Sequence, residues 1–440
     1  MCTQTLRTLF INAIAIMGTL MTVNCNTTIT NPKGTFVTTE NGKIVQNSKP
    51  QYYIGTNFWG APILGSTGCG GNRERLHKEL DNLKALGIDN LRILVGADAG
   101  SKNANSVYPY LQPQPGVLND TLLVGLDYTL AELEKRNMTA VLYLTNSWDW
   151  SGGYGFYLRE CGYGDSPNAS GDGYGDYVKY SADFVRDERA REMYYNHVRS
   201  IVSRKNSITG RYYKDEPSIM SWQICNEPRP FDERNKQLFA EWIATTAQII
   251  KSIDVNHLVS TGSEGLYGCE VDEQLCEKIH SDKNIDYLTI HIWPLNWGWA
   301  SRNAPDEGIE SACEKAKEYI DLHVAMSKRI GKPLVIEEFG YSRRENRYTL
   351  DADVDSRDKF YAYIFDCVIE SASQQGVIAG CNFWGWGGMG RPRATVWSAG
   401  DDLLCDPPHE PQGWYSVFDC DSTTTRLISE KTEKLKQYIK

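Results

Sequence analysis

Short apolar runs alternate with amphipathic segments along the chain from residue 50 onwards. Several of these runs are continuous rather than alternating, which is typical of parallel strands covered on both faces. We therefore predict eight strands, at residues 52–57, 90–95, 139–146, 219–226, 257–262, 287–291, 333–338 and 378–384.

The segments between these runs have apolar residues three and four positions apart, as amphipathic helices do. They predict helices at residues 73–86, 121–136, 188–204, 232–253, 272–280, 309–330, 355–374 and 425–439. Strand and helix alternating eight times favour an α/β fold of the closed (β/α)8 TIM-barrel type, as a single domain with long βα loops. Two of those loops, 152–175 and 386–414, are expected to be ordered at the surface.

The N-terminus is typical of an export signal. Arg7 is the only charge in the first thirty residues, and residues 9–23 are largely apolar. We predict a signal peptide at 1–25, a lead-in at 26–49 and the catalytic barrel at 50–440, in a secreted or cell-surface protein. Cys25 stands where a bacterial lipoprotein carries its lipid, but Thr22-Val23-Asn24 departs from the usual small-residue pattern, so a lipid anchor at Cys25 stays an alternative.

The composition of the chain limits the kinds of molecule that it is expected to bind. A formal net charge of −10 argues against a nucleic-acid binder, which needs basic patches to meet phosphates. The chain also has 12 Trp and 25 Tyr, whose flat faces suit stacking on sugar rings, although most of them are expected to pack in the core.

The cysteines fit an exported protein. Two pairs bracket short polar segments and a third could join two loops, so the candidate disulfides are Cys269–Cys276, Cys405–Cys420 and Cys69–Cys161. Cys225 and Cys381 lie inside apolar strand patterns and are expected to be free buried thiols. None of the spacings matches a zinc site, and we expect no metal or other cofactor.

Polar side chains stand where the predicted strands end, which is where barrel enzymes place their reacting groups. Such groups are costly at the tips of apolar strands unless they are hydrogen-bonded or used. The polar residues at these ends are Asn57, Arg92, Asn146, Asn226, Glu227, Glu264, His291, Glu337 and Glu338.

Two of these strand ends carry the clearest chemistry. Ser-Trp-Gln-Ile-Cys-Asn-Glu-Pro ends the fourth strand at Glu227, and Pro-Leu-Val-Ile-Glu-Glu-Phe-Gly ends the seventh at Glu338. Glycoside hydrolysis with retention needs two carboxyl groups about 5–5.5 Å apart. The fourth and seventh strands face each other across a barrel mouth, so Glu227 and Glu338 are the predicted catalytic pair.

These two segments resemble the acid/base and nucleophile motifs of glycoside hydrolase family 5, and within it the endo-β-1,4-mannanases. The stretch 183–228 is similar to those enzymes nearly throughout, and the resemblance extends from about residue 52 to 384. It implies a retaining enzyme with Glu227 as acid/base and Glu338 as nucleophile. Glu337 is then the non-catalytic neighbour, expected on the opposite face of its strand.

The resemblance also implies roles around the pair. Asn226 would bind the sugar 2-hydroxyl, Arg92 would hold Glu338 ionised, and His291 would line the cleft. Trp384 would stack under the sugar at the cleavage site. The remaining substrate-binding candidates are Trp59, Asn146 and Trp293.

The chain departs from the family at Trp293, because the family usually has a Tyr there that is hydrogen-bonded to the nucleophile. An indole N–H can donate, but it cannot share a proton as a phenol does. Trp293 therefore enters as a binding candidate, and Trp293, Trp297 and Trp299 together are expected to form a sugar platform.

The leading interpretation is an endo-acting hydrolase of β-1,4-mannosidic bonds in mannan, glucomannan or galactomannan. A β-1,4-glucanase of the same family and an exo-acting mannanase are the nearest alternatives, the latter because residues 152–175 could close one end of a cleft. A non-catalytic carbohydrate-binding barrel is a further class, which the presence of both Glu227 and Glu338 argues against. A metal-dependent hydrolase is disfavoured because no H-E-x-x-H motif occurs.

Overall fold

The computed structural model describes residues 36–103, 105–170 and 173–439. The predicted signal peptide and Cys25 lie outside the described residues. The described residues belong to one compact unit.

Eight parallel strands form the barrel, in the order β8-β7-β6-β5-β4-β11-β10-β9. All eight predicted strands are confirmed, and nearly every residue in them is buried, as their apolar composition requires. The strands are β4 (Tyr53–Asn57), β5 (Asn90–Leu94), β6 (Thr139–Tyr143), β7 (Ile219–Gln223), β8 (Leu258–Ser260), β9 (Leu288–Ile292), β10 (Leu334–Phe339) and β11 (Ile378–Phe383). Strands β6 and β7 end three residues earlier than predicted, because beyond them only an isolated bridge joins Asn146 to Asn226.

The barrel has a seam between β8 and β9, which are the two ends of the strand order. Two backbone hydrogen bonds join the described residues on its two sides, from Asp286 N to Val259 O (2.8 Å) and from His291 N to Glu264 O (3.3 Å). The hydroxyls of Thr261 and Thr289 lie 3.3 Å apart across it. β8 and β9 are thus not paired as a ladder, unlike the other neighbouring strands of the barrel.

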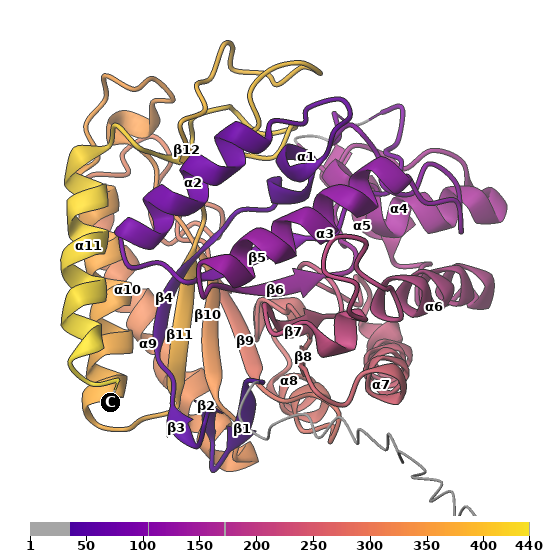
Figure 1. Cartoon of the computed structure of the whole chain (residues 1–440), viewed down its shortest axis with the longest axis horizontal. Coiled ribbons are helices and arrows are strands. Elements are labelled where there is room, and N and C mark those ends of the chain that lie inside the picture. The colour runs from indigo at the N-terminus through magenta and orange to yellow at the C-terminus, as the bar shows by residue number, and fades with distance from the viewer. Residues whose placement is uncertain (1–35, 104, 171–172, 440) are drawn as a thin grey trace, which may run out of the picture. The chain divides into compact units, whose positions relative to one another are not determined.

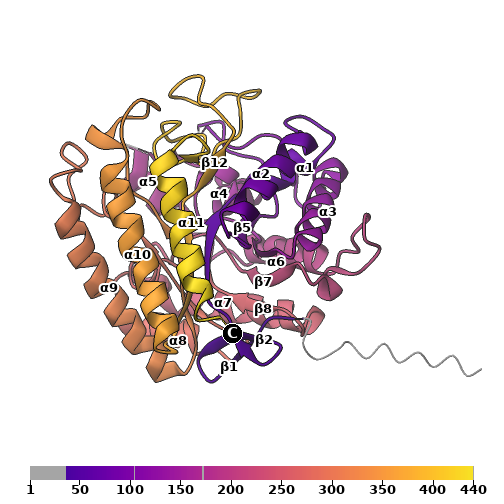
Figure 2. The same ribbon diagram turned by 60° about the vertical axis from the view of Figure 1, so that its left-hand side comes forward.

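Helices surround the strands (Figures 1 and 2), and α9, α10 and α11 lie side by side on one flank. Each predicted helix is present, with ends shifted by a few residues. The α-helices are α1 (Ala61–Gly65), α2 (Arg73–Ala85), α3 (Asp120–Lys135), α4 (Gly153–Leu158), α5 (Tyr174–Ser181), α6 (Glu188–Val202), α7 (Lys236–Ile253), α8 (Glu273–His280), α9 (Ile309–Ile330), α10 (Asp355–Ser373) and α11 (Ser422–Lys436). No helix in the described part of the chain is long and apolar enough to span a membrane.

Several helices begin where a side chain accepts hydrogen bonds from free backbone N–H groups. Asn72, Asn119, Asp187 and Asp272 cap α2, α3, α6 and α8 in this way. Each of these four side chains therefore fixes the start of its helix.

A small antiparallel sheet lies at one end of the barrel, formed by β1 (Thr38–Glu40), β2 (Lys43–Gln46) and β3 (Lys49–Pro50). It occupies the predicted lead-in. Ile44 is buried in one apolar cluster with residues of the barrel strands such as Val141 and Val335. Figure 1 shows this sheet below the strands, so the loops that follow the strands meet at the other end.

Both long loops contain more structure than the sequence predicted. Residues 152–175 include α4 and a π-helical turn, and Tyr154 and Tyr157 are fully buried there. The segment after β11 starts with β12 (Trp386–Gly388), which pairs with β13 (Val417–Phe418). The irregular stretch between them, residues 389–416, is called the strap below.

The candidate disulfides are wrong in this structure, because all ten described cysteines are free. Cys405 is buried and Cys420 is exposed. Cys269 and Cys276 are both buried and close enough to interact as thiols. The burial of Cys225 and Cys381 as free thiols is confirmed.

Candidate active site

Two carboxylates meet at the mouth of the barrel, one four residues beyond the end of β7 and one in β10. Oxygen atoms of Glu227 and Glu338 and a ring nitrogen of His291 all lie within 4.8 Å of one another. Glu338 is 2% exposed and Glu227 is 8% exposed, so both are shielded from bulk water but reach a pocket. The sequence prediction that these two residues face each other matches this geometry.

Arg92, from β5, is fully buried and positions the nucleophile candidate. Its Nη1 donates to Glu338 and to Asn57 Oδ1 (3.0 Å). Its Nε donates to Gln223 Oε1 (2.7 Å) and its Nη2 to Asn226 Oδ1 (2.7 Å). The planar guanidinium is therefore fixed in place by amide oxygens at and just beyond the ends of β4 and β7, and it is hydrogen-bonded to the carboxylate of Glu338.

The charges around Glu338 decide its ionisation. Burial alone would raise its pKa, but the positive charges of His291 and Arg92 outweigh burial and lower the pKa below its ordinary value. Glu338 is thus an ionised carboxylate in a nearly closed site, as an attacking group requires.

The prediction for Glu337 is wrong, because its side chain does not lie on the opposite face of β10 from that of Glu338. Its carboxylate accepts from Gln223 Nε2 (2.5 Å) and Tyr287 Oη (3.2 Å) inside the barrel, and it lies 3.8 Å from Arg92. The pairing of β10 with β9 shifts register between Ile336 and Glu338, and such a bulge breaks the alternation of side chains. Burial is the first cause that raises the pKa of Glu337.

His291 bridges the two carboxylates. Its Nδ1 lies 2.8 Å from Glu227 Oε1 and 3.3 Å from Glu338 Oε2. Burial would lower its pKa, but the two carboxylates outweigh this and raise it to about 9. One ligand atom from each of these three residues lies within 4.8 Å of the others, which is also the spacing of a possible metal site.

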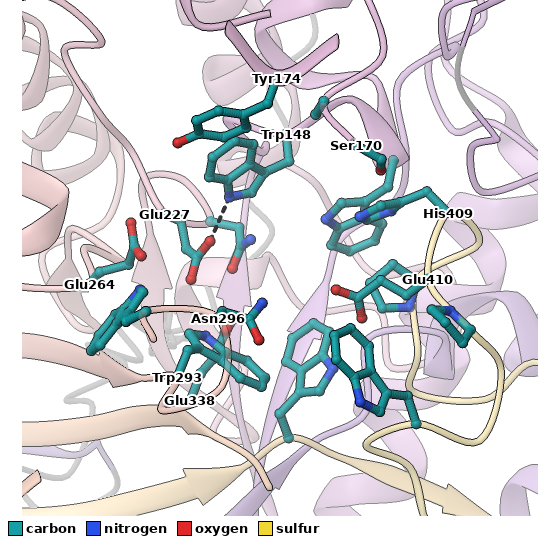
Figure 3. A pocket seen from close by; sticks show the side chains of 18 of the residues that line it. Trp148, Ser170, Tyr174, Glu227, Glu264, Trp293, Asn296, Glu338, His409 and Glu410 are labelled. Atoms are coloured by element: carbon teal, nitrogen blue, oxygen red, sulfur yellow. Dashed lines mark hydrogen bonds between the residues drawn. The ribbon is translucent and has the colours of Figure 1, made fainter. Parts of the chain in front are cut away.

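Glu227 is held in a strained backbone conformation. Its φ is 49°, in the left-handed region that non-glycine residues seldom adopt. Its N–H donates to Gly262 O (2.9 Å) and its carbonyl accepts from Ser147 Oγ (2.6 Å). The carboxylate accepts from Trp148 Nε1 (2.5 Å), which is the dashed line in Figure 3. Neighbouring loops therefore fix both the backbone and the side chain of this residue.

The carboxylates open into a pocket of about 510 Å³, within the range of small-ligand sites. Its walls are rich in indole rings and polar groups, an arrangement that suits a polyhydroxylated ring with apolar faces. The lining residues are Trp148, Trp150, Ala169, Ser170, Tyr174, Asn226, Glu227, Arg229, Glu264, Trp293, Asn296, Trp297, Arg302, Glu338, Trp384, Pro407, His409, Glu410, Pro411 and Trp414.

Of the predicted binding residues, Asn226, Trp293 and Trp384 line this pocket. The other three polar candidates do not, and they act from behind the lining. Asn146 accepts from Asn226 Nδ2 (3.1 Å), while Arg92 and His291 contact the carboxylates.

Trp59 was predicted to bind substrate, but the structure places it outside the pocket. It is 3% exposed, its Nε1 donates to Cys405 O (2.8 Å), and it does not line the pocket. Its ring lies 5.6 Å from that of Trp150, which does line the pocket. Trp59 is therefore hydrogen-bonded to the strap and packs against a residue of the pocket wall.

The expected tryptophan platform is only partly formed. Trp293 and Trp297 line the pocket, whereas Trp299 packs behind them and lies within 3.4 Å of the Tyr267 hydroxyl. Trp293 makes ring contacts with Trp384 and Tyr415, at centroid distances of 6.1 and 5.0 Å. The indole thus fills the place of the expected phenol as a wall of the pocket.

Several lining residues were missed from the sequence. Trp148 and Trp150 stand just beyond the third predicted strand, and this position after a barrel strand was the signal that could have found them. The strap residues Trp414 and Glu410 carried no such signal, because they lie more than twenty residues beyond their strand.

Comparison with known proteins places this geometry in a family. A profile described as "GH family 5 beta-mannosidase-like" matches residues 34–440. A putative mannan endo-1,4-β-mannosidase 9 of Oryza sativa subsp. japonica is 29% identical over 393 residues, covering 85% of this chain and 86% of the relative. Mannan endo-1,4-β-mannosidase 1 of Arabidopsis thaliana is 29% identical over 420 residues, covering 91% and 90%.

Solved structures agree with this. A glycoside hydrolase family 5 mannosidase from Rhizomucor miehei, in complex with mannosyl-fructose, superposes with a TM-score of 0.85 at 32% identity, covering 92% of this chain and 98% of that one. The endo-β-1,4-mannanase from Thermotoga petrophila gives a TM-score of 0.65 at 26% identity, with 88% and 78% covered. With the barrel, the paired carboxylates and the family profile in agreement, the chain is a (β/α)8-barrel glycoside hydrolase that belongs to the β-mannosidase-like group of family 5.

Proposed function

We propose that this enzyme hydrolyses β-1,4-mannosidic bonds of mannan-type polysaccharides by an endo-acting, double-displacement mechanism that retains configuration. One observation carries the mechanism: the Glu227 and Glu338 oxygens lie within 4.8 Å. Inverting enzymes separate their carboxyl groups by about 6.5–9.5 Å to leave room for a water molecule, whereas retaining enzymes need about 5–5.5 Å.

In the first step, Glu338 attacks the anomeric carbon while Glu227 gives its proton to the departing oxygen. The bond from the anomeric carbon to that oxygen breaks, and an ester to Glu338 forms. Arg92 and His291 keep Glu338 ionised for this attack. Trp148, which donates to Glu227, fixes the direction of that carboxyl group.

In the second step, water replaces the departed group. Glu227, now ionised, takes a proton from the water as its oxygen attacks the anomeric carbon and the ester to Glu338 breaks. The esterified Glu338 no longer carries a charge, so the imidazolium of His291 then faces Glu227 as its remaining charged partner. The same pair of residues thereby serves both half-reactions.

The substrate class rests on the relatives. The curated relatives from Oryza sativa and Arabidopsis thaliana are named mannan endo-1,4-β-mannosidases, and they match this chain over most of its length. The Rhizomucor miehei structure holds a mannosyl sugar. We therefore assign mannan, glucomannan or galactomannan before β-1,4-glucan.

An exo-acting enzyme is the second candidate, and the strap is the observation that favours it. The strap contributes five residues to the wall of the pocket, namely Pro407, His409, Glu410, Pro411 and Trp414. A wall at this place would obstruct a long polysaccharide chain, whereas an open cleft would let the chain pass. Product lengths released from mannohexaose decide between the two. Release of mannose alone from one end supports exo action, and internal cleavage supports endo action.

The central test is an assay of the purified protein on pure mannan and on cellulose, with reducing ends counted over time. We expect hydrolysis of mannan only, with the β configuration retained in the first product seen by NMR. Glu338→Ala should be folded and less than about a hundredth as active, because covalent catalysis cannot proceed without its nucleophile. Cellulose hydrolysis without mannan hydrolysis would replace the substrate, and an inverted product would overturn the mechanism.

Export to the cell surface or medium is part of the same proposal, supported by the single charge and the apolar run in the first thirty residues. Fractionation of cells that express the full chain would place the activity. Cys25→Ala separates the two routes, because it should release a lipid-anchored enzyme from the membrane fraction and leave a cleaved, secreted one unaffected.

A further inference from the structure

Glu227 has a backbone conformation that its place in the sequence opposes. Its φ of 49° lies in the left-handed region, which costs free energy for any residue with a Cβ atom. Pro228 follows it, and a residue before proline prefers an extended backbone. In this conformation the carboxyl group lies 2.8 Å from His291 Nδ1 and faces the pocket. A strained backbone persists only where its surroundings hold it, so the contacts that hold this one also place the acid/base.

Ser147, in the loop after β6, holds this backbone from one side. Its N–H donates to Asn226 O (3.0 Å) and its Oγ donates to Glu227 O (2.6 Å), so one residue binds two consecutive carbonyl groups. From the other side, Gly262 O accepts from the N–H of Glu227 (2.9 Å). Ser147 is fully buried, so water cannot replace its hydroxyl if that group is removed. A side chain makes this bond, and a substitution can therefore remove it without altering the backbone.

Tyr177, on α5, holds Ser147 in turn. Its Oη donates to Ser147 O, and its ring stacks on that of Trp148 with the centroids 5.9 Å apart. Trp148 follows Ser147 in the chain, and its Nε1 donates to the carboxylate of Glu227 (2.5 Å; Figure 3). Tyr177 is fully buried and does not line the pocket. It can therefore affect the reaction only through the two residues that contact Glu227.

We propose that Ser147 and Tyr177 are positioning residues for the step in which Glu227 gives its proton to the departing oxygen. This assignment rests on the proposed function. Proton transfer needs the carboxyl group within hydrogen-bond reach of that oxygen, and a backbone that relaxes toward the extended conformation moves the group away. Neither residue lines the pocket. Ser147 acts through the backbone of Glu227, and Tyr177 acts through Ser147 and Trp148.

The test compares Ser147→Ala and Tyr177→Phe with the wild type on two substrates that differ in their leaving group. Dinitrophenolate leaves an aryl β-mannoside without a proton, whereas the sugar that leaves mannobiose needs the proton from Glu227. The value compared is kcat/KM, which covers the steps up to formation of the ester at Glu338. Because the same folded molecules act on both substrates, the ratio of the two values does not depend on how much of a variant is folded.

We expect Ser147→Ala to lower kcat/KM about tenfold on mannobiose and about twofold or less on the dinitrophenyl β-mannoside, because the buried carbonyl of Glu227 loses its partner. Tyr177→Phe keeps the ring and removes one hydroxyl, so it should show the same selectivity with a loss of about threefold on mannobiose. Ser218→Ala is the matched control. Ser218 is a buried serine just before β7, and its hydroxyl has no partner in the described part of the chain, so this variant should match the wild type on both substrates.

Equal losses of Ser147→Ala on the two substrates overturn the proposal, because a purely structural role lowers both values by the same factor. Wild-type activity of Ser147→Ala or of Tyr177→Phe on mannobiose overturns it as well. Two other outcomes concern the proposed function instead. A Glu227→Ala variant that slows both substrates equally refutes the acid/base assignment, and a wild type inactive on every β-mannoside refutes the proposed substrate.

Discussion

Replacing Arg92 with methionine tests the electrostatics of the site most directly. Arg92 donates four hydrogen bonds, to Glu338, Gln223, Asn57 and Asn226, and it is fully buried. Arg92→Met keeps much of the volume but removes the charge and every donor. Glu338 then keeps His291 as its charged partner, while its burial, which favours the neutral acid, is unchanged.

The expected size follows from the bond that is lost. A hydrogen bond to a charged group contributes about 1.5–3 kcal/mol. Because that bond stabilises the ionised form, its loss should raise the pKa of Glu338. Because only ionised Glu338 attacks, the acidic limb of kcat/KM should move to higher pH. Breaking a buried ion pair should also destabilise the fold by about 3–5 kcal/mol.

The assay is the pH profile of kcat/KM on an aryl β-mannoside, measured on protein whose circular dichroism shows that it is folded. Arg92→Lys is the matched control. It keeps the charge but not the planar fork, so its acidic limb should move less than that of Arg92→Met. If the limb of folded Arg92→Met stays at the wild-type pH, Arg92 does not hold Glu338 ionised, and the argument fails.

Three further predictions concern the same pocket. Glu227→Ala should slow mannobiose far more than an activated aryl mannoside, as kcat comparisons will show; equal losses would mean that Glu227 is not the acid. Trp384→Ala should cost about 1–3 kcal/mol of binding on short and long substrates alike, by analogy with other ring-stacking contacts; an unfolded variant would instead mark Trp384 as structural. The folded pKa of His291, about 9, lies above its ordinary value, so its contribution to stability is fully present below about pH 6.5 and is lost as the pH rises through 9. Urea unfolding at pH 6, 8 and 10 measures that loss, and His291→Ala should lack it.

The barrel was predictable because buried parallel strands leave a direct trace in the sequence. The runs that became β7 and β10 are rich in apolar residues, and Glu227 and Glu338 stand near or just beyond their carboxyl ends. Polar residues at such a point are costly unless they are used, so the catalytic pair could be selected without coordinates.

The bulge in β10 was not predictable, because it depends on how β10 pairs with β9. It turns Glu337 inward, and strict alternation along a strand could not reveal that. The contribution of the strap to the pocket could not be predicted from the sequence for a related reason. Glu410 lines the pocket because Asp406 accepts hydrogen bonds from the backbone of later residues in the strap. The conformation of the strap is therefore set by contacts within the folded protein rather than by a local sequence pattern.

The seam between β8 and β9 also affects how the enzyme loses activity on heating. His291 donates its backbone N–H across this seam to Glu264, and its ring bridges the two catalytic carboxylates. Regions held by few backbone bonds open at a lower free energy than the global unfolding of a protein. A transient parting of these two strands would tilt the imidazole away from Glu227 and Glu338 while the rest of the barrel stayed intact. Loss of turnover on warming should thus precede loss of the fold, and amide hydrogen exchange at Asp286 and His291 should be faster than in the ladders on the far side of the barrel.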